Sequence, residues 1–241
     1  WRVASASLDK TIQVWDAASG EKIATYKGHT GMISSVAWSP DGKQIASASS
    51  GDQDTTVQLW DASTGARVFT YHGHSYWARS VAWSPDGKHL ASGSLKEVQV
   101  WHPVEGQKVS SLRSQGGWVR VLAWSPDGKY IAASGEDKQV QVWEAAKSRL
   151  IATHRGQGER VNGLAWSPDG KYIAAISIDA LVQVWEVEQP RHSPLPRHAS
   201  QGSLFTSHAR ASSVHALAWL PDGKHLAAAD GDGSVQVWQV V

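Results

Sequence analysis

The sequence has no cysteine among its 241 residues, which excludes disulfide bonds and thiolate metal sites. Its 23 basic and 22 acidic residues nearly balance, so the sequence lacks the large net positive charge that is typical of proteins that bind nucleic acids or anionic membranes. No apolar run approaches the roughly 20 residues needed to cross a bilayer. We therefore expect a cytoplasmic protein that binds neither nucleic acid nor membrane.

Phenylalanine is almost absent, with two residues, whereas tryptophan occurs fourteen times. Eleven of these tryptophans belong to a repeat. The segment 37–43 reads AWSPDGK, and it returns at 82–88, 123–129 and 165–171 and in altered form at 218–224. Six further tryptophans each end a Gln-Val-Trp or Gln-Leu-Trp triplet: Trp15, Trp60, Trp101, Trp143, Trp185 and Trp238. The distances between successive members are 45, 41, 42, 42 and 53 residues. A period near forty residues indicates a repeat architecture.

One period predicts four short strands. In the second unit these are residues 33–38, 44–49, 56–60 and 67–71. The Pro-Asp-Gly sequence after the first strand favours a tight turn, because proline presets φ and glycine accepts a positive φ. The unit is therefore a four-stranded antiparallel meander. Apolar residues occupy both alternating sets of strand positions, so each sheet needs cover on two faces, which a β-propeller provides.

These motifs resemble the WD-repeat family. The resemblance lies in the Gly28-His29 and Gly73-His74 pairs, the Ser-Pro-Asp-Gly turns, and the Trp15-Asp16 and Trp60-Asp61 pairs, and it covers essentially the whole chain. It implies an all-β WD-repeat β-propeller. The near-identical turns resemble those of bacterial propellers attached to signalling kinases or NTPases.

The repeat predicts one propeller domain over 1–241 with 22 strands, in four complete blades and two three-stranded partial ones. The first blade lacks its first strand and the last lacks its fourth. We therefore expect part of a seven-bladed ring, closed by further parent sequence or by a partner chain. The expected blades are 1–28 (partial), 29–73, 74–114, 115–156, 157–209 with a loop insertion at 188–202, and 210–241 (partial).

The resemblance also implies a structural polar network in each blade. It joins a histidine before the first strand, a serine in the second, an aspartate in the following turn and the tryptophan of the third. The second blade has all four, whereas the third has Leu95-Lys96 where the aspartate is expected, and the fourth and fifth have Ala133 and Ala175 for the serine. We favour hydrogen-bond satisfaction over catalysis for this network. Its residues in the second blade are His29, Ser47, Asp54 and Trp60.

No cofactor or metal is expected. His72-x-His74 is the one close histidine pair along the sequence, and Gly156-Gln157-Gly158 lacks the strand and helix context of a dinucleotide loop.

The residues six and four positions before the tryptophan of each first strand are not dictated by the repeat. The resemblance places them around the mouth of a central channel, on the partner-binding face. Tryptophan and arginine dominate binding hot spots, and the arginines favour acidic or phosphorylated ligands. The alternative is that each tryptophan covers its own blade with an arginine stacked on it. The predicted partner-binding residues are Met32, Tyr76, Trp77, Arg79, Trp118, Arg120, Arg160, Asn162 and His215.

The sequence thus predicts a non-enzymatic scaffold or sensing module that binds a protein or peptide. Two alternatives stay open. A hydrolase or lyase propeller would need convergent carboxylates or histidines in the channel, and a purely structural ring would use the blade edges as its interface.

Overall fold

The computed structural model describes residues 1–51, 54–187, 203–209 and 214–240; the expected insertion at 188–202 lies outside these residues. The chain divides into two compact units, Trp1–Ser111 and Leu112–Val241, and each is described here by itself. The described residues form twenty strands and one short 3-10 helix, Ala145–Lys147. The predicted all-β fold of antiparallel four-stranded sheets is confirmed.

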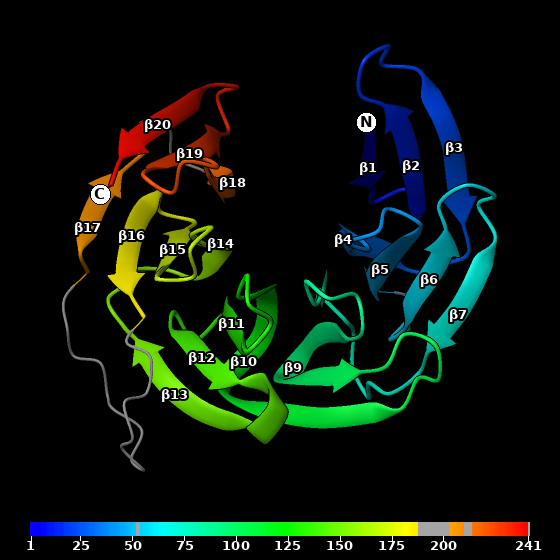
Figure 1. Cartoon of the computed structure of the whole chain (residues 1–241), viewed down its shortest axis with the longest axis horizontal. Coiled ribbons are helices and arrows are strands. Elements are labelled where there is room, and N and C mark those ends of the chain that lie inside the picture. Colours follow the sequence, from blue (N-terminus) through cyan, green and yellow to red (C-terminus); the bar gives the residue numbers. More distant parts are fainter. Residues whose placement is uncertain (52–53, 188–202, 210–213, 241) are drawn as a thin grey trace. The chain divides into compact units, whose positions relative to one another are not determined.

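The first unit contains the strands β1 to β9 and the beginning of β10. Figure 1 shows them in order from blue to green. The first three strands make a three-stranded sheet: β1 (Arg2–Ala6), β2 (Thr11–Asp16) and β3 (Lys22–Lys27). The next four make a four-stranded sheet in sequence order: β4 (Met32–Trp38), β5 (Gln44–Ser50), β6 (Val57–Asp61) and β7 (Arg67–Tyr71). An antiparallel pair follows: β8 (Ser80–Trp83) and β9 (Leu90–Trp101).

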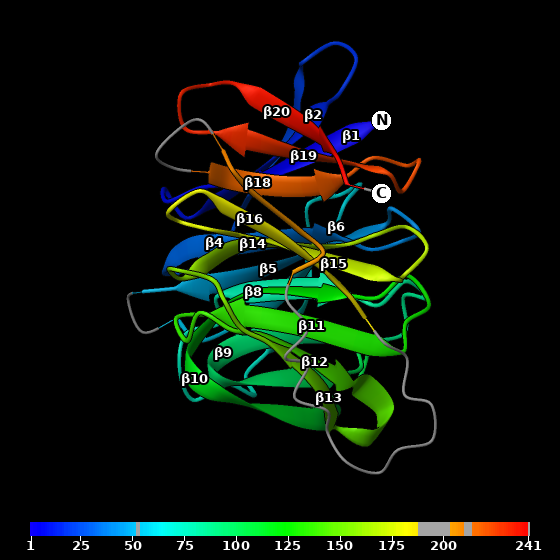
Figure 2. The same cartoon turned by 90° about the vertical axis from the view of Figure 1, so that its left-hand side faces the viewer.

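The second unit repeats the same pattern, and Figure 2 shows its last three strands side by side in orange and red. The later part of β10 (Lys108–Trp124) begins a run of four paired strands that continues with β11 (Tyr130–Gly135), β12 (Val140–Glu144) and β13 (Arg149–His154). The next sheet has four strands: β14 (Val161–Trp166), β15 (Tyr172–Ser177), β16 (Leu181–Glu186) and β17 (Phe205–His208). The last has three: β18 (Val214–Trp219), β19 (His225–Asp230) and β20 (Val235–Gln239).

The described strands number twenty rather than the expected 22, because β9 and β10 each join two predicted strands. In β9 the chain passes through Lys96, whose φ of 60° lies in the left-handed region, so the two predicted strands follow one another without a loop. In β10 the fourth strand of the third blade runs directly into the first strand of the fourth.

The Ser-Pro-Asp-Gly turns have one hydrogen-bond pattern. In the second blade Ser39 Oγ donates to Asp41 Oδ1 at 2.6 Å and accepts from the Gln44 N–H at 2.9 Å. Gly42 closes the turn at a φ of 68°, which glycine adopts without strain. The altered fifth copy has Leu220 in place of the serine, and there Asp222 instead accepts from the backbone N–H groups of Lys224 and His225. The turn survives because the carboxylate still caps it.

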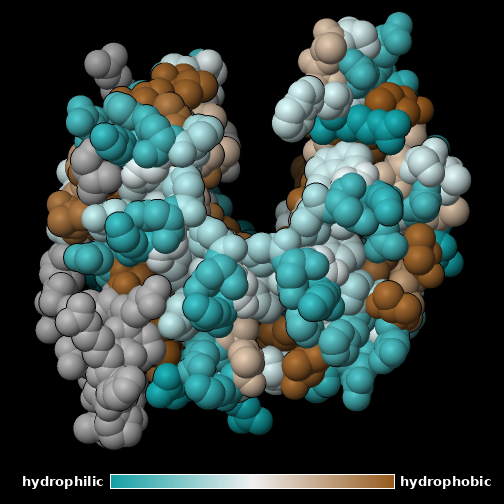
Figure 3. All heavy atoms as spheres, viewed as in Figure 1, coloured by the Kyte–Doolittle hydropathy of each residue, from teal (hydrophilic) through white to brown (hydrophobic). Residues whose placement is uncertain are grey.

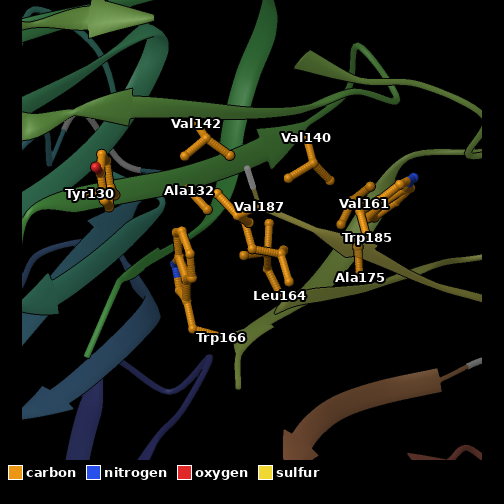
Figure 4. Close-up of a cluster of buried hydrophobic side chains, with 11 residues drawn as sticks. Tyr130, Ala132, Val140, Val142, Val161, Leu164, Trp166, Ala175, Trp185 and Val187 are labelled. Carbon is orange, nitrogen blue, oxygen red and sulfur yellow. The ribbon is translucent and has the colours of Figure 1, made fainter. Parts of the chain in front are cut away.

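The core of each unit lies between successive sheets. In the first unit Leu59, Leu90 and Trp101 are fully buried in one cluster with alanines of β5. In the second, Val142 of β12 packs with Leu164 of β14, as Figure 4 shows. On the face drawn in Figure 3, hydrophobic residues form separate patches between hydrophilic ones. Successive sheets within a unit therefore bury apolar residues against each other, whereas the three-stranded sheets leave apolar residues exposed, among them Val3, Val235 and Val237.

The described residues contain no helix with the length and apolar character to span a membrane.

Candidate functional site

The structure brings together all four network residues of the second blade. The ring of His29 lies between two partners: Nδ1 is 2.9 Å from Asp54 Oδ2 and Nε2 is 2.7 Å from Ser47 Oγ. Trp60 Nε1 donates to the same Ser47 oxygen at 2.9 Å. Because a carboxylate only accepts, Nδ1 carries the proton toward Asp54, and Nε2 accepts from the serine hydroxyl.

This network is buried, and Ser47 has no exposed surface. Burial alone would raise the pKa of Asp54, but hydrogen bonds from His29 and Thr56 outweigh it and hold that pKa well below its usual range. The carboxylate also accepts from the Thr30 N–H at 2.9 Å. A serine whose oxygen is enclosed by an indole and an imidazole has no path to a substrate, so the arrangement fits a structural role.

The third blade replaces the missing aspartate with a residue that the sequence did not single out. His74 Nε2 lies 2.6 Å from Ser92 Oγ, and Trp101 Nε1 donates to that oxygen at 3.1 Å. His74 Nδ1 lies 3.6 Å from Glu97 Oε1, which is an ion-pair distance but too long for a hydrogen bond, and Nδ1 has no hydrogen-bond partner among the described residues. The nearby His74 lowers the pKa of Glu97. The glutamate on the third strand thus approaches the histidine without forming the hydrogen bond that Asp54 forms. The signal in the sequence was an acidic residue directly after Leu95-Lys96.

The fourth and fifth blades leave several buried polar atoms unpaired. Asp137 Oδ2 is buried without a hydrogen-bond partner in the described part of the chain, and burial raises the pKa of Asp137. Both ring nitrogens of His154 and both side-chain polar atoms of Gln157 are likewise buried and lack partners among the residues described. Burial lowers the pKa of His154 to about 4. The second and third blades also contain such atoms, among them Trp38 Nε1 and Trp83 Nε1, so the unpaired groups do not single out the blades that lack the network.

In the first unit, the predicted binding residues lie mainly in the loop that leads into β8. Tyr76 is 54% exposed, and the guanidinium of Arg79 lies 5.6 Å from the centre of the Trp77 ring. This is the stacked arrangement that the alternative hypothesis describes. Ser94 Oγ donates to the carbonyls of Tyr76 and Trp77 at 3.1 and 2.9 Å, which fixes the backbone of the loop.

Met32 begins β4 and is 41% exposed. Its neighbour Ser34 donates to the Ala78 carbonyl at 3.1 Å, so the start of β4 is tied to the loop before β8. The structure therefore places the start of β4 beside the Trp77 and Arg79 loop.

In the second unit, Trp118 and Arg120 lie within β10 and are half-buried. Arg120 forms an ion pair with Glu136, with 3.3 Å between Nη2 and Oε1. Arg160 and Asn162 are exposed at the start of β14. The side chain of His215 is outside the described residues. The two units are placed separately, so the predicted adjacency of Trp77 and Trp118 stays a prediction.

The residues that the structure describes contain no group of three or more histidine, aspartate or glutamate side chains arranged for a metal ion. One close histidine pair was nevertheless missed. His89 and His102 are far apart in sequence, yet their ring centres are 4.8 Å apart. His72-x-His74 is therefore not the one close pair of the folded chain.

Comparison with known families gives two matches. Residues 2–203 match the family described as the IFT122 first beta-propeller, and residues 200–239 match the WD domain, G-beta repeat. Together they cover almost all of the sequence.

Comparison with individual proteins gives matches about one repeat long. Ribosome assembly protein 4 of Chaetomium thermophilum is 50% identical over 44 residues, which is 18% of this chain and 8% of that protein. Coronin-7 of Rattus norvegicus is 49% identical over 45 residues, 19% of this chain and 5% of the relative. Nuclear distribution protein PAC1 of Mycosarcoma maydis is 44% identical over 45 residues, 19% of this chain and 10% of the relative. None of these three is named as an enzyme.

Proposed function

Because this chain belongs to the family described as the IFT122 first beta-propeller, one of the WD-repeat β-propellers, we propose that it is a non-enzymatic scaffold or sensing module in the cytoplasm. Its ligand is a protein or a peptide. The matched relatives support an interaction role through their shared repeat. Each match is only one repeat long, so the identity of their partners does not carry over.

The observation that carries this proposal is the loop before β8. Tyr76 projects more than half of its surface into solvent beside the stacked Trp77 and Arg79. Tryptophan, tyrosine and arginine are the residues most enriched at binding hot spots, and here all three are neighbours in one loop. The hydrogen bonds from Ser94 hold the loop in one conformation, so little ordering entropy is lost when a partner binds.

In the second unit an arginine suits an acidic or phosphorylated ligand. Arg160 is exposed, and its guanidinium matches the geometry of a carboxylate or phosphate. Arg120 differs, because Glu136 already pairs with it. An anionic ligand at Arg120 would compete with that carboxylate, so we assign anion recognition in this unit chiefly to Arg160.

The test uses the intact parent protein as bait, followed by measurement of the affinity for the captured partner. The variant Tyr76→Ala with Trp77→Ala should lose binding by about 2 kcal/mol or more, the scale of a hot spot. The matched control is Val68→Ala on β7, because Val68 is 52% exposed, close to the 54% of Tyr76. Unchanged affinity in the double variant would refute the proposed site, as would an equal loss in the control.

The second unit is tested separately with Trp118→Ala and with Arg160→Ala. We expect Arg160→Ala to weaken binding of an acidic or phosphorylated peptide and to reduce its dependence on salt. Binding that is equally tight without Arg160 would remove the second unit from the site.

A further inference from the structure

The third blade has histidines at both of two neighbouring positions, whereas each of the four sheets compared below has at most one histidine there. The corresponding positions are directly paired across neighbouring strands in four other sheets: Gln44 with Asp61, Tyr130 with Glu144, Tyr172 with Glu186, and His225 with Gln239. In the third blade they are His89 and His102. The repeat therefore accepts many residues here, and its packing does not require a histidine pair.

The two imidazoles lie close together at an accessible place. Their ring centres are 4.8 Å apart with an angle of 35° between the planes, and both residues are half-buried. His102 Nδ1 lies 3.3 Å from the carbonyl oxygen of Lys88. A carbonyl only accepts, so Nδ1 carries the proton and Nε2 keeps a free lone pair. Histidines that bind metals are oriented in this way, with the second ring nitrogen donating to a backbone carbonyl or carboxylate.

We propose that His89 and His102 form a two-histidine binding site for a divalent transition metal, with Zn²⁺ as the ion. Imidazole nitrogen is a preferred zinc ligand, at a Zn–N distance of about 2.0–2.1 Å. In this proposal His89 rotates about χ1 and χ2 until one of its nitrogens faces His102 Nε2, while the contact of His102 Nδ1 with Lys88 keeps the His102 ring in place. Zinc is tetrahedral in most protein sites, so water fills the remaining positions.

This site is independent of the proposed interaction surface. The nearest carboxylate in sequence, Asp86, already accepts from Ser84 Oγ at 2.6 Å and from the Lys88 N–H at 3.1 Å, so it is committed to its turn. A site with two protein ligands binds more weakly than a closed structural zinc site. It serves as a reversible, concentration-dependent stabiliser of the third blade rather than as a folding requirement.

The experiment is a calorimetric titration of the chain with ZnCl₂ at neutral pH in a non-chelating buffer. The wild type should show a site that is lost or weakened at least about tenfold in His89→Gln and in His102→Asn. The second blade has Gln44 at the position of His89, so the fold tolerates the first replacement, and asparagine at position 102 removes the imidazole without supplying a carboxylate ligand. The matched control is His225→Gln, which removes a histidine from the position equivalent to His89 where the opposite residue is Gln239.

Thermal unfolding with and without ZnCl₂ supplies a second readout. The midpoint should rise with zinc in the wild type and in His225→Gln, and it should not rise in either variant of the pair. The proposal is overturned if the wild type binds no zinc, if the pair variants bind it as tightly as the wild type, or if His225→Gln loses binding equally. Zinc held by histidines elsewhere in the chain would persist in both pair variants and would count against the proposal.

Discussion

Replacing His154 by tyrosine should stabilise this protein, and most strongly in acid. His154 stands where the second blade has Tyr71, at the end of a fourth strand. Tyr71 stacks on Trp101 with ring centres 4.1 Å apart, and its hydroxyl donates to Gln99 Oε1 at 2.7 Å. His154 also stacks on a tryptophan, Trp185, at 5.2 Å, but neither of its ring nitrogens has a partner within the described residues.

The matching acceptor for a tyrosine is already present. Gln183 occupies the position in the repeat that is equivalent to Gln99. Its Oε1 is buried and has no hydrogen-bond partner among the described residues. A tyrosine at position 154 would donate to that oxygen as Tyr71 does to Gln99. One new hydrogen bond is worth about 1 kcal/mol at neutral pH.

The acid effect follows from the pKa of His154, which burial lowers from 6.5 to about 4. Between these two pKa values the unfolded chain binds a proton at His154 and the folded chain does not. The free energy of unfolding is therefore highest above the unfolded pKa of 6.5 and decreases as the pH falls toward 4. Between pH 7 and pH 5 this single residue costs the wild type about 2 kcal/mol, so His154→Tyr should be more stable by about 3 kcal/mol at pH 5.

Urea unfolding followed by tryptophan fluorescence measures the difference. With an m-value near 3 kcal/mol per molar, a change of about 2 kcal/mol moves the midpoint by about 0.7 M. The control is Tyr71→His, which should lose stability at neutral pH and gain the acid dependence. If the wild type and His154→Tyr lose the same stability between pH 7 and pH 5, His154 is not a buried neutral histidine and the reasoning fails.

Three further predictions follow from the contacts described above. Ser47→Ala should cost about 1–3 kcal/mol in the free energy of unfolding, because His29 Nε2 and Trp60 Nε1 both lose their partner; denaturant titration measures it, and a neutral effect would contradict it. Gly135→Ala should cost about 1–3 kcal/mol, since a Cβ there would lie 1.8 Å from the Trp118 carbonyl oxygen; an unchanged melting midpoint would show that the backbone yields freely. Amide hydrogen exchange should be faster in β11 and β15 than in β5, because Ala133 and Ala175 stand where Ser47 carries the polar network in β5, and equal protection would argue against this.

The sequence predicts the repeat, the antiparallel four-stranded sheets and the turns correctly, because these depend on residues close together in the chain. The Ser39 turn is complete within six residues, and its hydrogen bonds need nothing from the rest of the molecule. The network of the second blade was predicted from the resemblance to the WD-repeat family, whose network positions are matched here by His29 and Asp54 among others.

Tertiary structure alone decided which polar side chains meet when the repeat pattern is broken. Glu97 on the third strand approaches His74 where the aspartate is missing, and no periodic rule predicts that approach. His89 and His102 meet because strand pairing brings together residues that are remote along the sequence. His154 is left without partners among the described residues, although its position in the repeat looks ordinary. Period and turn chemistry fix the backbone, whereas the distances between side chains of different strands arise only after the strands have paired and packed.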